Sequence, residues 1–337
     1  MKYIIFLVSI LLAVDTLSAQ TISIVEQSRS TSIRGLSVVD EKVAWVSGSK
    51  GHVALSTNGG QTWTWQQVKG FEQSDFRDIE AFSAKEAIIM SSGTPAVILK
   101  TTDGGLSWQL CYREDDKTYF LDGLAFYDKM HGISMGDPIN GKFLLLETKD
   151  GGKTWTEESA GPDALKNEAA FAASGTSVYI VNKKANAVVL TGGSVSRLLY
   201  RTKAGTWNPV TMPLAQGQAS KGGFSVATGG GQTVLVGGNY SNDKNRDSIA
   251  CYYNGEQITG SNFHLAATMP NGYQSCVTYI EGKVFLSTGT SGSNVSYDGG
   301  LNWKPVDAGS YNVCQRSKKG KLVLLAGDKG RIAIFKL

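Results

Sequence analysis

Short segments in which apolar and polar residues alternate recur along the chain, separated by stretches rich in Gly, Asn and Asp. Residues 43–46 and 53–55, for example, lie on either side of the polar, glycine-containing stretch 47–52. Alternation with a period of two predicts β-strands, and the breaks predict tight turns. The pattern divides the chain into seven strand-rich units, at residues 32–67, 75–115, 119–159, 167–210, 222–261, 272–309 and 311–337.

An eight-residue phrase, [S/T]-x-[D/N]-G-G-x-x-W, recurs within these units. Four copies begin at Ser56, Thr101, Thr148 and Ser296, and a degenerate copy spans 202–207. The tryptophans stand at positions 63, 108, 155, 207 and 303, at intervals of 45, 47, 52 and 96 residues, of which the last is twice 48. A fixed period of this length is typical of a repeat architecture.

Each phrase has the composition of a tight turn. Paired glycines adopt positive φ angles without steric cost, and the Asp or Asn before them can accept hydrogen bonds from the backbone of the turn. The Trp buries a large ring in the strand that follows. We therefore predict a structural role for the central Asp or Asn and for the Trp of each copy: Asn58, Trp63, Asp103, Trp108, Asp150, Trp155, Asp298 and Trp303.

Four such phrases in register resemble those of the Asp-box (bacterial neuraminidase repeat) β-propellers. The resemblance implies four-stranded antiparallel blades in which the phrase links the third and fourth strands. The last unit ends after a third strand near Phe335, whereas residues 21–27 form an extra strand ahead of the first unit. Pairing the two would close the ring and remove two exposed sheet edges. We expect an all-β, seven-bladed propeller over residues 20–337, closed by its N-terminal strand.

Residues 1–19 have the composition of a secretory signal peptide. Lys2 precedes an apolar run over residues 4–14, and Leu17-Ser18-Ala19 provides small residues ahead of Gln20. The run is too short to span a bilayer comfortably. We expect an exported protein, periplasmic or secreted, that does not span the membrane.

Charge and potential metal ligands exclude several classes of function. The net charge is only +4, and the basic residues are scattered, so nucleic acid is not an expected partner. His52, His131 and His264 are isolated, and the four cysteines lack zinc or Cys-x-x-Cys spacing. No Gly-x-Gly-x-x-Gly motif follows a strand. We therefore expect neither a metal nor another cofactor, and the pattern leaves the oligomeric state open.

One polar column is expected to line the channel, because the first strand of each blade faces it in a propeller. Aligning those strands by apolar register gives a ring at one depth: Arg34, Arg77, Asp122, Glu168, Gly222, Gln274 and Asn312. Further polar residues are expected near this ring: Asp75, Asp78, Asp137, Lys221 and Tyr273. A water-filled channel needs polar walls whether or not it binds anything, so a merely structural ring is one interpretation.

The other interpretation of the ring is a binding site. Arg34 and Arg77 can hold a carboxylate or phosphate bidentately, with Asp75, Asp78, Tyr273, Gln274 and Asn312 as further ligand-binding candidates. Asp122 and Glu168 are a candidate acid/base pair.

Two cysteines occur close to the ring. Cys276 and Cys314 each follow the aligned ring position by two residues in neighbouring units, so their side chains are expected on the same side. Either a disulfide or two buried free thiols would satisfy this placement.

Nearly the whole chain after residue 19 resembles secreted propellers of Bacteroidetes-type bacteria. The segments that carry this resemblance are 32–36, 75–79, 136–138 and 272–276. Such proteins are often labelled oxidoreductases or related to the photosystem II stability/assembly factor. The latter resemblance implies a propeller scaffold that binds a protein through arginines, here Arg34 and Arg77. The residues themselves give an oxidoreductase no support.

Two hypotheses of function follow. The first is an exported, non-enzymatic scaffold that binds a partner protein or a small acidic ligand at the channel mouth. The second, prompted by the Asp box of sialidases, is a glycan-cleaving hydrolase or lyase that uses Asp122 and Glu168 with Arg34 and Arg77 as anchors.

Overall fold

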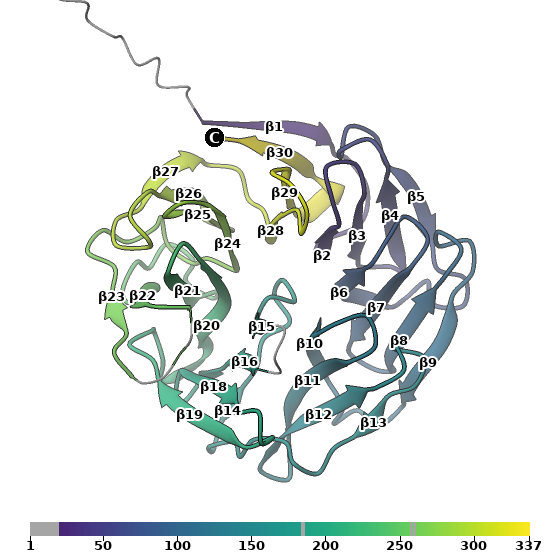
Figure 1. Ribbon diagram of the computed structural model, residues 1–337, viewed down its shortest axis with the longest axis horizontal. Coiled ribbons are helices and arrows are strands. Elements are labelled where there is room, and N and C mark those ends of the chain that lie inside the picture. Colours follow the sequence, from purple (N-terminus) through teal and green to yellow (C-terminus); the bar gives the residue numbers. More distant parts are fainter. Residues whose placement is uncertain (1–19, 183–185, 257, 259–260) are drawn as a thin grey trace, which may run out of the picture.

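The computed structural model describes residues 20–337 except 183–185, 257 and 259–260, and Figure 1 shows its sheets arranged radially around a central channel. In the described residues the strands form seven sheets. The predicted seven-bladed, all-β propeller is confirmed. No helix in the described part of the chain is long and apolar enough to cross a bilayer. The expected signal peptide, residues 1–19, lies outside the described residues.

The first three blades each use four consecutive strands. These are β2 (Ile33–Val38), β3 (Ala44–Gly48), β4 (His52–Ser56) and β5 (Thr64–Gln67) in blade 1; β6 (Asp75–Ala81), β7 (Ala87–Ser92), β8 (Ala96–Thr101) and β9 (Gln109–Glu114) in blade 2; and β10 (Leu121–Phe126), β11 (Gly132–Ile139), β12 (Lys142–Thr148) and β13 (Thr156–Glu157) in blade 3.

The remaining blades follow in chain order. Their main strands are β15 (Val178–Asn182), β16 (Asn186–Leu190), β18 (Arg197–Arg201) and β19 (Trp207–Thr211) in blade 4; β20 (Gln218–Gly229), β21 (Gln232–Asn239), β22 (Ala250–Asn254) and β23 (His264–Leu265) in blade 5; β24 (Cys276–Glu281), β25 (Val284–Gly289), β26 (Gly292–Ser296) and β27 (Lys304–Asp307) in blade 6; and β28 (Val313–Arg316), β29 (Val323–Ala326) and β30 (Ile332–Lys336) in blade 7.

The ring closes through its N-terminal strand, as predicted. Strand β1 (Thr21–Glu26) pairs antiparallel with β30, with Ile22 opposite Phe335, and becomes the outer strand of blade 7. Blade 7 is therefore held together by the two ends of the described chain (Figure 1). This pairing protects the outer edge of β30 from pairing with another chain.

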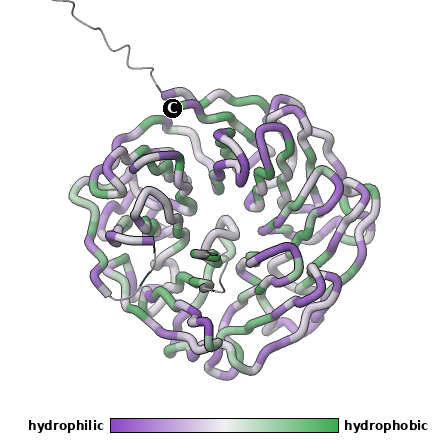
Figure 2. The backbone as a smooth tube through the Cα atoms, in the orientation of Figure 1, coloured by the Kyte–Doolittle hydropathy of each residue, from purple (hydrophilic) through white to green (hydrophobic). Residues whose placement is uncertain are grey.

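The hydrophobic core lies between neighbouring blades. Blades 1 and 2, for instance, bury Trp45 and Val53 against Phe76 and Leu99. Figure 2 shows the hydrophobic residues mainly along the strands and the hydrophilic ones mainly in the loops. Each blade thus needs both neighbours to bury its two faces, which makes the closed ring the stable unit.

Blade 4 differs from the prediction. Its first strand was expected at Glu168, but the strand that lines the channel is β15, ten residues later. Residues Glu168–Ala169 form β14, which pairs with β17 (Gly192–Gly193) and through it extends the sheet of blade 5. The prediction failed because the carboxylate of Glu168 is bound by Arg197, a long-range pairing described below.

The four complete phrases all form turns between the third and fourth strands of their blades. In the first, Oγ of Ser56 accepts the Gly60 N–H at 2.9 Å, and Oδ1 of Asn58 accepts the Thr62 N–H at 3.0 Å. The indole Nε1 of Trp63 donates to the Gly60 carbonyl at 3.0 Å. The side chains therefore replace water as partners of the turn backbone.

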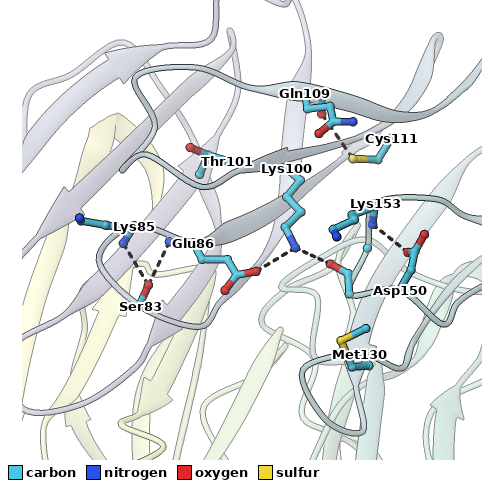
Figure 3. Close-up of polar contacts among 12 residues, drawn as sticks. Ser83, Lys85, Glu86, Lys100, Thr101, Gln109, Cys111, Met130, Asp150 and Lys153 are labelled. Carbon is cyan, nitrogen blue, oxygen red and sulfur yellow. Dashed lines mark hydrogen bonds and ion pairs between the residues drawn. The ribbon is translucent and has the colours of Figure 1, made fainter.

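The same turns also join neighbouring blades. A Cβ at Gly152, the second glycine of the third phrase, would lie 2.3 Å from Cδ1 of Ile88 in blade 2. In the same turn the Gly151 carbonyl accepts a 2.6 Å hydrogen bond from the buried Lys100, which also pairs with Glu86 at 2.8 Å (Figure 3). Lys100 therefore links blade 2 to the turn of blade 3.

Candidate functional site

Residues 171–177, which we call the channel plug, enter the central channel from blade 4. The Ala173 carbonyl accepts a hydrogen bond from Nη1 of Arg34 in blade 1 at 3.2 Å. Oγ of Ser174 donates to the Ser275 carbonyl at 2.8 Å, and Oγ1 of Thr176 donates to Oγ of Ser225 at 2.6 Å. The plug therefore divides the channel into two ends; we call the end at which the inner strands begin the mouth.

Arg34, Arg77 and Asp122 of the predicted ring occupy equivalent positions in their blades. The inner strands of blades 1, 2, 3 and 5 each contain a β-bulge, and the residues at the bulges are Arg34, Arg77, Asp122 and Phe224. A bulge redirects a side chain away from the regular alternation. In blade 5 the predicted residue, Gly222, lies two positions too early, because Gly222 pairs with Gly238 ahead of the bulge.

In blades 6 and 7 the ring position follows from the strand register. The first residue pairs after the ring position are Cys276 with Thr288 in blade 6 and Val313 with Ala326 in blade 7. The ring residues are therefore the residues just before them, Ser275 and Asn312. The prediction of Gln274 is therefore off by one residue. The amide of Gln274 is buried instead, where Nε2 donates to the carbonyls of Gly272 and Tyr273 at 3.2 and 3.1 Å.

Both ring arginines keep free donors. The one hydrogen bond of Arg34 within the described residues is that to Ala173. Nε of Arg77 pairs with Oδ2 of Asp75 at 2.7 Å, and its guanidinium lies 5.9 Å from the centre of the Phe120 ring. Since a guanidinium has five N–H donors, each retains capacity to bind an anion. The two stand on adjacent inner strands.

Aromatic side chains lie beside the plug in blades 5 and 6. Phe171 of the plug stacks on Phe224 with ring centres 4.1 Å apart, and Tyr273 meets Phe224 edge to face at 4.8 Å. Tyr240 packs edge-on against both Phe rings and is 52% exposed. The alignment of the predicted inner strands with one another did not identify Phe171 and Tyr240, because neither residue lies on an inner strand.

Asp122 is buried, with the Ala172 N–H and Arg77 as its favourable neighbours. Its side chain is fully inaccessible, and among the described residues neither carboxylate oxygen has a hydrogen bond. Burial, reinforced by the nearby Asp137, raises its pKa well above the usual value. Burial also raises the pKa of Asp137, whose Oδ1 accepts the Ala170 N–H at 3.2 Å. Burial therefore shifts both carboxyls toward their neutral forms.

Glu168, the other catalytic candidate, is fully engaged in a buried ion pair. Arg197 donates from Nε at 2.8 Å and from Nη2 at 2.5 Å, one bond to each carboxylate oxygen. Oγ1 of Thr191 and the Leu165 N–H donate to the same carboxylate. The side chain is inaccessible to solvent. This arrangement ties residues 163–168 to residues 191–197 and leaves no oxygen of Glu168 free for acid/base chemistry.

Asn312 joins blade 7 to blade 1 rather than facing open solvent. Its Nδ2 donates to the Ile33 carbonyl and to Oδ1 of Asp328, each at 3.0 Å. Asp328 in turn has a lowered pKa, in which hydrogen bonds from Ser32 and Asn312 outweigh the effect of burial. The Asn312 amide thus has a structural role.

Asp78 belongs to a series of side chains that cap the inner edges of the blades. In blades 1, 2, 3, 6 and 7 an N–H group of the inner strand donates to a polar side chain of the preceding blade. The acceptor and donor pairs are Ser37 and Ala81, Asp78 and Leu124, Ser225 and Val277, Thr278 and Arg316, and Gln315 and Val38. Burial raises the pKa of Asp78 to about 7.

Cys276 and Cys314 are free thiols, so the disulfide alternative is wrong. The corrected register places Cys276 opposite Thr288, one position earlier on its strand than Cys314. Despite this difference in register the two thiols interact, and their contact lowers the pKa of Cys276 and raises that of Cys314. Each also donates to a carbonyl: Cys276 to Cys314 O at 3.2 Å, and Cys314 to Leu286 O at 3.6 Å.

Within the described residues no group of three or more His, Cys, Asp or Glu side chains is arranged to hold a metal ion. The channel mouth therefore combines two half-buried arginines, an aromatic cluster and carboxyls that burial keeps from ionising readily. Such a surface suits an anionic group next to an apolar one.

Comparisons with known proteins agree with this architecture. Residues 15–116 match the family model described as photosynthesis system II assembly factor YCF48. No curated protein matches the chain significantly. A structure described as YCF48 bound to D1 peptide has 14% identity and a TM-score of 0.64, covering 95% of this chain and 97% of that one. YCF48 from Cyanidioschyzon merolae has 14% identity and a TM-score of 0.65, covering 94% and 99%.

An enzyme shares the fold too. The GH74 xyloglucanase from Xanthomonas campestris has 15% identity and a TM-score of 0.67, covering 93% of this chain but only 53% of that one. At such identities the likeness concerns the fold. The chain thus has the propeller fold seen in YCF48 structures, and its residues 15–116 match the YCF48 assembly-factor model.

Proposed function

We propose that this protein is a non-enzymatic propeller scaffold that binds an acidic segment of a partner protein at the channel mouth. The observation that carries the proposal is the pair Arg34 and Arg77. They occupy the same bulge position in adjacent blades, and each keeps donors free. Two neighbouring guanidiniums can hold a carboxylate by charge-assisted, bidentate hydrogen bonds.

The electrostatics of the mouth support an anionic partner. Asp75 neutralises part of the charge of Arg77 through its 2.7 Å ion pair. Asp122 and Asp137 neutralise less, because burial raises their pKa values and favours the neutral carboxyls. The buried carboxyls therefore leave much of the positive charge of the two arginines uncompensated.

The aromatic cluster indicates that the partner also carries an apolar group. Tyr240 is half exposed above the stacked Phe171 and Phe224. A rigid aromatic surface next to a cation is a common arrangement in peptide recognition. A peptide in complex with another protein of this fold, YCF48, is consistent with such a role.

The carboxylates give glycan cleavage little support. Acid/base hydrolysis needs two carboxyls that face a cleft and reach the scissile bond. Asp122 is inaccessible to solvent, and both oxygens of Glu168 are bound by Arg197. Because a GH74 xyloglucanase shares the fold, the enzymatic alternative is also tested below.

The proposal includes export. Cleavage of the predicted signal peptide after Ala19 would leave the closing strand Thr21–Glu26 whole. We expect the mature protein to begin at Gln20, which N-terminal sequencing of the protein from cell envelope and medium would establish.

The test is capture of partners from envelope extracts, followed by affinity measurement with acidic segments of the captured proteins. The double variant Arg34→Ala/Arg77→Ala should weaken binding at least tenfold, since each charge-assisted hydrogen bond contributes roughly 1.5–3 kcal/mol. Arg113→Ala is the matched control, because Arg113 pairs with Asp115 at 2.6 Å on an outer strand, far from the channel.

Equal binding by the double variant and the control would overturn the proposal. Release of sugars from xyloglucan or sialylated glycans, lost in Asp122→Asn, would favour the enzyme instead.

A further inference from the structure

The end of the channel opposite the mouth is a blind cavity of about 460 Å³. Inner strands of all seven blades line it, from Leu36 in blade 1 to Cys314 in blade 7. Ser174, Gly175 and Thr176 of the channel plug form its floor. Its volume lies within the range of small-molecule sites, roughly 300–1,000 Å³.

The floor is rigid. Asp78 accepts the Ile79 and Leu124 N–H groups at 2.7 and 2.8 Å, and a Cβ at Gly175 would lie 2.2 Å from Oδ1 of Asp78. Thr176 is held by Ser225. A preformed cavity of this kind loses little conformational entropy when it binds a ligand.

The charges of the cavity do not balance. Its charged side chains are those of Asp78, Glu80, Arg316 and Lys318. Glu80 and Lys318 pair at 2.6 Å and compensate each other. The side chain of Arg316 has neither an ion pair nor a hydrogen bond among the described residues. Burial raises the pKa of Asp78 to about 7, so this carboxyl is only partly ionised at neutral pH.

Hydroxyl groups complete the polar part of the wall. Oγ of Ser317, next to Arg316, is buried and has no hydrogen-bond partner in the described part of the chain. Such a group costs free energy unless a partner satisfies it. Tyr179 and Thr228, joined by a 3.1 Å hydrogen bond, also line the cavity. Apolar residues, Leu124 and Val277 among them, line the rest of the wall.

We propose that this cavity is a second binding site, for a small anionic molecule whose carboxylate or phosphate group is held by Arg316. The ligand enters from the end of the channel opposite the mouth, and the plug separates it from Arg34 and Arg77. The guanidinium supplies charge-assisted hydrogen bonds to the anionic oxygens, and the Ser317 hydroxyl supplies a neutral one. Apolar lining residues such as Leu124 and Val277 contact the remainder of the molecule.

The test is calorimetric titration of the mature protein with inorganic phosphate and with citrate, each at pH 7.5. We expect saturable binding of at least one of them at one site per chain, and the tighter of the two identifies the preferred anionic group. Arg316→Gln should weaken that binding at least tenfold. Thr228→Glu, which adds a carboxylate to the cavity wall and keeps Arg316, should weaken it as strongly.

Two controls separate this site from the mouth. Arg113→Gln removes an equal charge from an exposed outer strand and should bind the anion like the parent protein. Arg34→Ala/Arg77→Ala removes any anion binding at the mouth, and the binding that remains should be lost when Arg316→Gln is added. Circular dichroism establishes that each variant is folded, and Thr228→Glu decides the matter if Arg316→Gln does not fold. Absence of binding by the parent, or unchanged binding by the folded cavity variants, overturns the proposal.

Discussion

Aspartates of the turn phrases and aspartates of the channel differ in what surrounds their oxygens. Asp103, in the second turn, accepts hydrogen bonds from Oγ and N–H of Ser107 at 2.5 and 3.0 Å, and these bonds lower its pKa to about 2. In the channel, burial raises the pKa of Asp78 to about 7 even though it accepts two backbone N–H groups. In Asp122, too, burial outweighs the Ala172 N–H and Arg77 and raises the pKa.

The difference shows where carboxylate charge counts in this fold. The turn aspartates remain in contact with water and stay ionised, so they stabilise the turns electrostatically. Asp78 and Asp122 have lost water, and burial shifts them toward the neutral form, so they offset less of the positive charge of Arg34, Arg77 and Arg316. A repeated Asp in this chain is therefore structural, whereas the arginines that we propose to bind anions do not recur at one position in every blade.

The largest loss of stability is expected when the buried carboxylate of Glu168, like that of Asp122, has no ion-pair partner. Arg197→Ala would leave the inaccessible carboxylate of Glu168 without its bidentate partner. We expect a loss of about 3–5 kcal/mol in the free energy of unfolding, because a buried charge without its counterion is strongly destabilising. Urea denaturation measures it.

The matched control is Lys142→Ala. Lys142 pairs with Asp163 at 2.6 Å, but both side chains are mostly exposed. Exposed pairs contribute little, so no measurable change is expected. A loss for Arg197→Ala no larger than for the control would show that Glu168 does not depend on its partner.

The second prediction concerns the pH dependence of stability and uses Asp78→Asn. The unfolded chain releases this proton near pH 3.8, whereas the folded protein holds it until about pH 7. Between these values the folded state binds more protons, so the unfolding free energy falls as pH rises. The shift of about three units corresponds to as much as about 4 kcal/mol over this window.

Asp78→Asn should remove that fall. The variant loses one acceptor for Leu124 or Ile79 at every pH, so its stability relative to the parent should improve steadily from pH 4 to pH 7. Urea denaturation at four pH values gives the difference. A difference independent of pH would mean that Asp78 titrates normally and that the channel does not suppress its charge.

The sequence predicted the features of the fold that depend on local interactions. Each turn phrase makes its hydrogen bonds within four residues, as Ser56 and Asn58 do, so its pattern is visible in one short segment. The bulge positions of Arg34, Arg77 and Asp122 were likewise located by the short apolar pattern that follows each of them. The closing strand was found because the last unit lacked one.

The errors came from contacts that are distant in sequence. Glu168 precedes two alanines just as an inner strand would predict, but its partner Arg197 stands 29 residues later. The plug is held by blades 1, 5 and 6, and only its run of small residues, 172–177, distinguishes it in the sequence. A one-residue register difference, invisible in the pattern, separated Cys276 from Cys314.

The third prediction separates the two roles of the turn glycines. Gly152 and Gly141 have φ angles of +79° and +81°, but a Cβ at Gly152 would meet Ile88, whereas one at Gly141 would meet nothing. Gly141→Ala should cost about 1 kcal/mol, from backbone strain alone. Gly152→Ala should cost about 2–3 kcal/mol, because overpacking against blade 2 is added. Equal losses in urea denaturation would show that the turn does not pack tightly on the preceding blade.

The smallest effect should come from Asp103→Asn, since the first phrase already has Asn58 at the equivalent place. There Oδ1 accepts the Thr62 N–H at 3.0 Å, while Nδ2 donates to Oγ1 of Thr62 at 2.8 Å. Oγ of Ser107 donates to Asp103 and would have to accept from Asn, which a hydroxyl can do by rotation. At pH 7 we therefore expect the same thermal midpoint as in the parent.

At low pH the variant and the parent should diverge. The lowered pKa of Asp103 gives the parent a contribution that is fully present above pH 3.8 and is lost as pH falls through about 2. Asp103→Asn lacks this titration, so the midpoint of the parent should fall more than that of the variant between pH 4 and pH 2. Asp103→Ala, which removes the acceptor, should lower the midpoint at pH 7 as well. A clear loss for Asp103→Asn at pH 7 would show that the turn requires the charge and not only the acceptor, and the two regions would then differ in more than exposure to water.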